Sequence, residues 1–215
     1  MNGAIRRERL ALARLYLVIE ARPHGREPDA LLAAALRGGV DIVQLRDKEL
    51  RDEELVRVSA SFRRACDAYG ALFVLNDRPD LVEACGADGV HVGQDDEPVA
   101  SARALVGPEL LVGLSTHSRA EMDAARGADY IGVGTIFATP TKPESNAAGL
   151  ELVRIASEAA RVPWFAIGGI ELANVALVAE AGARGIAVVR AIRDAPDPEA
   201  AARALRAALG EPPPS

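Results

Sequence analysis

Two aspartates lie just beyond short apolar runs of the chain and could together bind a divalent cation. Asp77 follows the run at 72–75, and Asp96 follows the run at 89–92. Mg²⁺ prefers oxygen ligands and typically takes one or two carboxylates, with waters and substrate phosphates completing its shell. The alternative is that each carboxylate caps a helix that begins two residues later, near a proline. The pattern leaves both roles open.

Three basic side chains accompany these carboxylates in polar segments. Arg46 and Lys48 follow another apolar run, and Lys142 lies in a Thr- and Pro-containing stretch. Three cations around a carboxylate pair fit a polyanion such as diphosphate, whose charge Mg²⁺ and basic side chains would share. The competing interpretation is a set of surface ion pairs, for example of Lys48 with Glu49 or Asp52.

The elements that must position these residues alternate along the chain. Apolar runs of strand length are each followed by a stretch rich in Ala and Leu, which predicts strand–helix units. The eight predicted strands are 15–19, 41–45, 72–75, 89–92, 110–114, 130–133, 164–167 and 185–189. The predicted helices are 28–37, 52–69, 79–85, 98–106, 118–126, 149–160, 171–181 and 197–209. Asp52 is a candidate helix cap, and Ser118 with Glu121 has the spacing of a capping box.

This order of elements predicts the fold class. Short links between successive units require parallel strands and right-handed crossovers. Eight units predict an α/β protein, a single (β/α)8 TIM barrel over residues 1–210, followed by a disordered Pro-rich tail at 211–215. An open doubly wound sheet is the alternative, but its first turn is usually GxGxxG, and residues 20–25 do not match that pattern.

A weak internal repeat accompanies every second predicted strand. Residues 39–42, 86–89, 127–130 and 182–185 each begin with Gly and place a polar residue just before or within a strand. Glycine suits the left-handed turn that closes a helix. The repeat therefore fits a regular succession of helix and strand.

In a barrel, the carboxyl ends of all strands meet at one mouth, where active sites form. Gly168 and Gly169 follow the seventh strand and Val189 ends the eighth, at the loops that commonly hold phosphate in such barrels. A tight strand-to-helix turn explains the same glycines equally well. His91 is predicted to be a satisfied core or rim residue, and His117 to serve the start of the helix at 118–126.

Composition excludes several other classes. The 215 residues are 49% apolar, enough for a folded core, and only 4% aromatic. The net charge of −6 argues against a general nucleic-acid binder. No apolar run approaches the ~18 residues of a membrane span, and we expect no signal peptide. Cys66 and Cys85 form no CxxC or zinc spacing, so we expect buried, reduced thiols in a cytoplasmic protein rather than a disulfide.

At the level of motifs, the chain resembles the thiamine phosphate synthase (thiamine-phosphate pyrophosphorylase) family from about residue 15 to residue 209. The matching segments, in order along the chain, are QLRDK at 44–48, NDR at 76–78, GVHVGQDD at 89–96, GLSTH at 113–117, FATPTK at 137–142, GGI at 168–170 and GIAVV at 185–189. The resemblance implies an Mg²⁺-dependent transferase with small-molecule substrates. Hydroxymethylpyrimidine diphosphate loses diphosphate, and the nitrogen of a thiazole phosphate attacks the exocyclic methylene carbon to give thiamine phosphate.

The resemblance also implies roles for individual residues. Asp77 and Asp96 are the implied Mg²⁺ ligands. The residues implied to contact the pyrimidine diphosphate are Gln44, Leu45, Arg46, Asp47, Lys48, Asn76, Ser115 and Lys142, of which Arg46, Lys48, Ser115 and Lys142 act in catalysis. The residues implied to bind the thiazole phosphate are Thr139, Pro140, Thr141, Gly169, Val189 and Arg190, the last three through the backbone. Tyr16 and His91 are implied to flank the pyrimidine ring.

Two departures from the family pattern and two rival functions remain. Many members have Thr-Asp where this chain has Glu20-Ala21, and many have Ser where Arg190 stands. A thiazole tautomerase on the same barrel would use the histidine at position 117, but it generally lacks the carboxylates of Asp77 and Asp96. A non-catalytic regulator that binds a phosphate ligand is the second rival. Association into homo-oligomers stays open.

Overall fold

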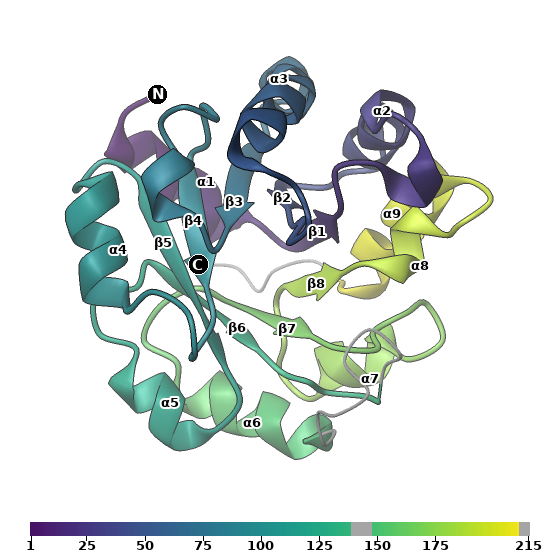
Figure 1. The fold of residues 1–215 in the computed structure, drawn as a ribbon. Coiled ribbons are helices and arrows are strands. Elements are labelled where there is room, and N and C mark those ends of the chain that lie inside the picture. The colour runs from purple at the N-terminus through teal and green to yellow at the C-terminus, as the bar shows by residue number, and fades with distance from the viewer. Residues whose placement is uncertain (139–147, 211–215) are drawn as a thin grey trace.

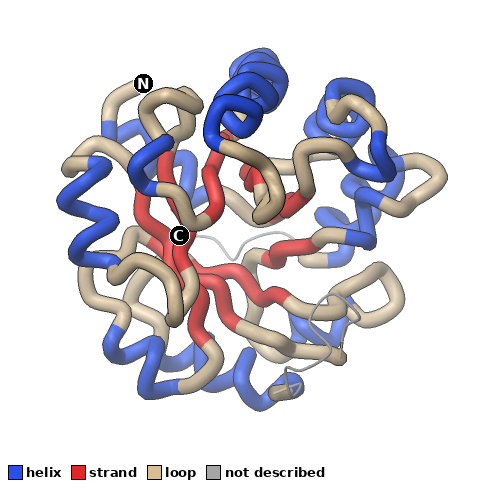
Figure 2. The backbone as a smooth tube through the Cα atoms, in the orientation of Figure 1, coloured by secondary structure: helices blue, strands red, loops and turns tan. Residues whose placement is uncertain are grey.

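The computed structural model describes residues 1–138 and 148–210. Its eight strands run parallel in chain order and form a closed barrel, with β8 paired to β1. Figures 1 and 2 show the strands at the centre and the helices around them. The strands are β1 (Leu15–Ile19), β2 (Ile42–Leu45), β3 (Leu72–Asn76), β4 (Gly89–Val92), β5 (Leu111–Thr116), β6 (Tyr130–Val133), β7 (Trp164–Ile167) and β8 (Ile186–Val188). The predicted fold class is confirmed, and every strand was predicted to within two residues at each end.

The outer layer consists mainly of helices that follow the strands, as predicted. These are α2 (Asp29–Arg37), α3 (Asp52–Tyr69), α4 (Val99–Val106), α5 (Arg119–Ala124), α6 (Gly149–Ala159), α7 (Val175–Glu180) and α9 (Pro198–Ala208). A 3-10 turn, η1 (Pro23–Gly25), lies in the loop after β1. Ser118 accepts a hydrogen bond from the Glu121 backbone, so the predicted capping contact forms.

Two predictions about the helices are wrong, and two helices were missed. The helix predicted at 79–85 is only a 3-10 turn, η2 (Pro79–Leu81), because in so short a segment most backbone groups belong to helix ends and lack intrahelical partners. Asp52 does not cap α3. The cap is Arg51, without a side-chain bond, while the Asp52 carboxylate accepts from Arg78 at 2.6 and 2.9 Å. Two helices were not predicted at all: α1 (Gly3–Leu12) and α8 (Arg190–Arg193).

Helix α1 contacts β3 and β5 and lies at the amino-terminal end of the barrel. The side chain of Asn2 caps it by accepting from the Ile5 N–H at 3.0 Å. Leu10 is 2% exposed and packs with Ile42 and Leu72, whose side chains fill the barrel interior. The helix was missed because its exposed face is rich in arginine, which weakens the apolar periodicity.

The internal repeat has a structural role at the same end of the barrel. In three of the four copies, an aspartate just before an even strand accepts a backbone N–H of the preceding odd strand. Asp41 accepts from Leu15 (3.0 Å), Asp88 from Phe73 (3.0 Å) and Asp129 from Val112 (2.9 Å). These contacts fix the start of each even strand against its neighbour.

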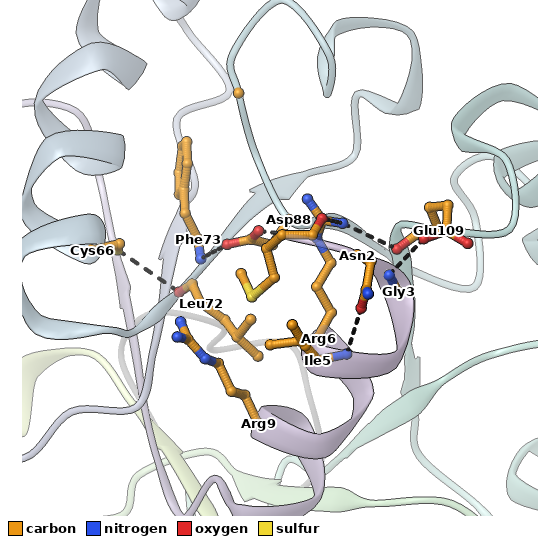
Figure 3. A network of polar contacts seen from close by, with 12 residues as sticks. Asn2, Gly3, Ile5, Arg6, Arg9, Cys66, Leu72, Phe73, Asp88 and Glu109 are labelled. Atoms are coloured by element: carbon orange, nitrogen blue, oxygen red, sulfur yellow. Dashed lines mark hydrogen bonds and ion pairs between the residues drawn. The ribbon is translucent and has the colours of Figure 1, made fainter.

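Arginines pair with the repeated aspartates, and two of these arginines lie on α1. Arg6 pairs with Asp88 at 3.0 Å, and Arg7 pairs with Asp129 at 2.8 Å. A third arginine, Arg63 of α3, contacts Asp88 at 2.8 Å. Figure 3 shows Asp88 between Arg6 and the Phe73 backbone. The ion pairs therefore hold α1 across the amino-terminal end of the barrel.

Asp88 should consequently be a stability residue without a role in activity. Its side chain is 3% exposed, and Asp88→Ala leaves the Phe73 N–H and two arginines without their acceptor. We expect the free energy of unfolding to fall by about 3–5 kcal/mol, measured by urea denaturation. Asp67→Ala is the matched control, since Asp67 also pairs with Arg63 but is 68% exposed, and it should cost less than about 1 kcal/mol. Equal losses in the two variants would contradict this assignment.

Both cysteines are free and buried, as predicted. Burial raises the pKa of the Cys66 thiol to about 12, so this group stays protonated near neutral pH. Among the described residues, no helix is long and apolar enough to cross a bilayer.

Candidate active site

A cavity of about 490 Å³ opens at the carboxyl ends of the strands, and residues of all eight strands line it. Eight of the residues singled out from the sequence and the resemblance lie on its wall through side chain or backbone. They are Tyr16, Gln44, Arg46, Asn76, His91, Ser115, Val189 and Arg190. His117 and the glycines Gly168 and Gly169 also line it. The strand ends therefore bring seven of the sixteen residues predicted for the substrate and metal sites to one cavity.

Other predicted residues lie elsewhere. The Leu45 side chain is 1% exposed and packs in the layer between strands and helices, so only its backbone could serve the cavity. The Asp47 carboxylate accepts from the N–H groups of Ala21 and Glu49, each at 3.2 Å, which holds the loop after β2 against the loop after β1. Thr139, Pro140, Thr141 and Lys142 lie outside the described residues.

The two aspartates proposed as metal ligands come together. Asp77 directly follows β3 with a left-handed φ of 60°, and its N–H donates to the His91 carbonyl at 2.9 Å. Its Oδ2 lies 2.9 Å from Lys48 Nζ, and the Asp96 carboxyl lies nearby. Burial, and secondarily the nearby Asp96, raise the pKa of Asp77 against the opposing effect of Lys48. Two facing carboxylates of this kind are the donor set that a hard cation fits.

The alternative role of these aspartates as helix caps does not hold. The residue before η2 is Arg78 and the residue before α4 is Pro98, and neither position has a side-chain cap. Asp96 Oδ2 instead accepts from the Gly93 N–H at 2.9 Å, within its own loop. The described residues contain no group of three or more His, Cys, Asp or Glu side chains placed to hold a metal. The pair would thus leave most of a cation's shell to water and substrate oxygens.

The basic residues of the mouth fall into two groups. Lys48 pairs with Asp77, not with Glu49 or Asp52 as in the surface-pair alternative. Arg193 pairs with Glu20 at 3.1 Å and with Asp194 at 2.6 Å. Arg46 and Arg190 line the cavity and form no ion pair with any residue that the structure describes. Their positive charge is available to an anionic ligand.

The glycines after β7 meet two demands at once. Gly168 and Gly169 have φ of 110° and 62°, which supports the tight-turn interpretation. Side chains there would also collide with the loop after β6. A Cβ on Gly168 would lie 2.5 Å from Thr135 Cγ2, and one on Gly169 would lie 2.8 Å from Phe137 Cβ. Their backbone still faces the cavity, so the turn does not exclude a phosphate-binding role.

Five polar side chains form a connected floor beneath the cavity. The hydrogen-bond distances are 2.7 Å from Gln44 Nε2 to Tyr16 Oη, 3.0 Å from Tyr16 Oη to Tyr130 Oη, 3.2 Å from Tyr130 Oη to His91 Nδ1, and 3.0 Å from His91 Nε2 to Ser115 Oγ. Tyr130 was predicted from the sequence only as a strand residue, without a role in the site. His117 does not serve its helix through the ring, because its Nδ1 contacts the Gly134 carbonyl.

A closed barrel with a carboxylate pair, two arginines without an ion pair among the described residues and a polar floor at its mouth is typical of a TIM-barrel enzyme. The sequence profile described as thiamine monophosphate synthase matches residues 15–192. The chain belongs to this family.

Individual relatives agree with the family assignment. A thiamine-phosphate synthase of Acidothermus cellulolyticus is 50% identical, with 93% of this chain and 96% of that protein aligned. One of Streptomyces avermitilis is 50% identical over 91% and 93% of the two chains. The solved thiamine phosphate pyrophosphorylase of Pyrococcus furiosus superposes with a TM-score of 0.84 at 33% identity, over 95% and 97% of the chains. The chain is a transferase enzyme.

Proposed function

We propose that this enzyme joins 4-amino-2-methyl-5-hydroxymethylpyrimidine diphosphate to thiazole phosphate and releases thiamine phosphate and diphosphate. The observation that carries the proposal is the Asp77–Asp96 pair with Lys48, next to a cavity lined by Arg46, which has no ion partner in the part of the chain that the structure describes. This arrangement suits the departure of a highly charged leaving group. It is also the part of the site that a thiazole tautomerase generally lacks.

The reaction exchanges one bond for another. The bond between the pyrimidine methylene carbon and the diphosphate oxygen breaks, and its electron pair leaves with diphosphate. The thiazole nitrogen then donates its lone pair to the resulting pyrimidine carbocation. No side-chain nucleophile is required, so the protein contributes position and charge.

The cationic residues would provide most of the stabilisation of the leaving diphosphate. Arg46 and Lys48 would neutralise the developing charge on diphosphate, joined by Lys142 as the resemblance implies. Asp77 and Asp96 would hold Mg²⁺, which when bound supplies further positive charge to the diphosphate oxygens. Ser115 would donate a hydrogen bond to the same substrate.

The cavity has room for two subsites. Gln44, Asn76, Tyr16 and His91 line the cavity from β1 to β4 and would bind the pyrimidine ring. Gly169, Val189 and Arg190 line it after β7 and β8, where backbone N–H groups would bind the thiazole phosphate. Thr139, Pro140 and Thr141 are proposed to complete that subsite.

The purified chain with both heterocycles and Mg²⁺ provides the test of this function. We expect thiamine phosphate, detected as a fluorescent thiochrome after oxidation, and we expect none when either heterocycle or Mg²⁺ is omitted. Conversion of the non-aromatic thiazole tautomer, without condensation, would show a tautomerase instead. Binding of phosphate ligands without turnover would show a regulator.

A further inference from the structure

The polar floor of the cavity has one consistent direction of hydrogen bonding. The side-chain nitrogen of Gln44 can only donate, so Tyr16 Oη accepts at that contact. Tyr16 is 2% exposed, and its remaining hydroxyl neighbour is Tyr130. A buried hydroxyl proton needs an acceptor, so Tyr16 donates to Tyr130.

The same reasoning gives the donor and acceptor roles of Tyr130, His91 and Ser115. Tyr130 accepts from Tyr16 and therefore donates to His91 Nδ1, which must be unprotonated. The ring proton of a neutral His91 then sits on Nε2 and is donated to Ser115 Oγ. Ser115 accepts there, so its own proton is directed to another acceptor. Because Ser115 lines the cavity, that acceptor can be the substrate.

The reverse direction fails at Tyr16. If Ser115 donated to His91 Nε2 and His91 Nδ1 donated to Tyr130, then Tyr130 would donate to Tyr16. Tyr16 would receive two protons, one from Tyr130 and one from Gln44, and its own buried proton would have no acceptor among the hydrogen bonds of this floor. Gln44 therefore sets the direction of all the hydrogen bonds in the cavity floor.

Both tyrosines are protonated donors under all ordinary conditions. Burial raises the pKa of Tyr16 above its usual range, and burial likewise raises the pKa of Tyr130. Neither phenol can lose its proton to become a pure acceptor near neutral pH. The direction therefore does not depend on pH through these two groups.

The barrel reserves space for Tyr130 in particular. A Cβ on Gly113 of β5 would overlap the Tyr130 ring and lie 2.5 Å from its Oη. Gly132 of β6 lies against His91, since a Cβ there would be in van der Waals contact with His91 Cε1 at 3.4 Å. Phe165 packs edge-on against Tyr130 with ring centroids 6.0 Å apart. These neighbours hold the Tyr130 phenol in place between Tyr16 and His91.

We propose that Tyr130 is a positioning residue that, through His91, makes Ser115 a hydrogen-bond donor to the anionic substrate. Tyr130 fixes the Nε2–H tautomer of His91. In that tautomer His91 donates a hydrogen bond to Ser115 Oγ, so the Ser115 hydroxyl proton remains available to the substrate. The kinetic part of this inference rests on the proposed function, whereas the tautomer does not.

The first test reads the tautomer by ¹⁵N-edited NMR of the histidine rings, at about pH 8.5, well above the ordinary histidine pKa. The chain has three histidines, and the spectra of His24→Gln and His117→Gln identify the signal of His91. We expect an unprotonated Nδ1 and a protonated Nε2 in the wild-type protein. In Tyr130→Phe we expect this preference to weaken. A wild-type Nδ1–H tautomer would overturn the proposal, and this result needs neither turnover nor the Tyr130→Phe variant.

The second test is a kinetic comparison of Tyr130→Phe, Ser115→Ala and the double variant. Tyr130→Phe should lower kcat about tenfold to a hundredfold with little change in the KM for thiazole phosphate. Because Tyr130 acts through Ser115, the double variant should be no slower than Ser115→Ala alone. Tyr69→Phe is the matched control, since Tyr69 is 44% exposed on α3, and it should keep wild-type activity. Losses that multiply in the double variant would contradict the proposal, because Tyr130 would then act independently of Ser115.

Discussion

Replacing Asp77 or Asp96 by alanine should abolish most Mg²⁺-dependent turnover while leaving the barrel folded. A bound metal supplies several kcal/mol of charge stabilisation, which corresponds to about a 10²–10³-fold loss of kcat. The two carboxylates lie close together, so each variant removes one of the two proposed protein ligands for the cation. The measurement is thiamine phosphate formation as a function of Mg²⁺ concentration, with circular dichroism to confirm the fold.

The neighbouring Asp95 provides a matched control for this prediction. It is exposed in the same loop as Asp96 and makes no hydrogen bond or ion pair within the described residues. Asp95→Ala should keep wild-type turnover and the wild-type response to Mg²⁺. Wild-type-like turnover in Asp77→Ala or Asp96→Ala would refute the metal assignment.

Replacing Arg46 by methionine should produce the second large effect. The residue lines the cavity without an ion pair among the described side chains, so its charge is available to the leaving diphosphate. Removing one group that stabilises developing charge typically costs about 10²–10³-fold in kcat. Arg46→Lys should recover part of this loss, since it keeps the charge but not the planar two-pronged donor geometry.

Steady-state kinetics of both Arg46 variants check this prediction. Arg51→Met is the control, because Arg51 is an exposed arginine at the start of α3. It should leave kcat and KM unchanged. If Arg46→Met raised KM and left kcat intact, Arg46 would contribute to binding in the ground state only.

The barrel could be predicted from the sequence because its strands are continuous apolar runs separated by helices of ordinary length. The parts that escaped prediction lack such a pattern. Helix α1 is rich in arginine and is held by Arg6 and Arg7, whose partners lie 82 and 122 residues away. Helix α8 has four residues, too few to show a helical period.

Site residues could be proposed from the sequence where polar residues follow strand ends. They could not where a residue's role depends on strand register or on contacts within a loop. Asp77 and Asp96 could be proposed as a pair, because carboxyl ends of parallel strands converge. Tyr130 could not be placed, since its role depends on the register of β5 and β6, which sets it against Gly113. Asp47 shows the opposite case, in which a polar residue at a strand end serves the loop backbone.

The most direct measurement of the central claim is the stoichiometry of the two products. The purified enzyme would be given both heterocycles with Mg²⁺, and thiamine phosphate and diphosphate would be quantified in the same samples over time. The proposed reaction predicts equal amounts of the two at every time point. Release of diphosphate without thiamine phosphate, or the formation of neither product, would contradict it.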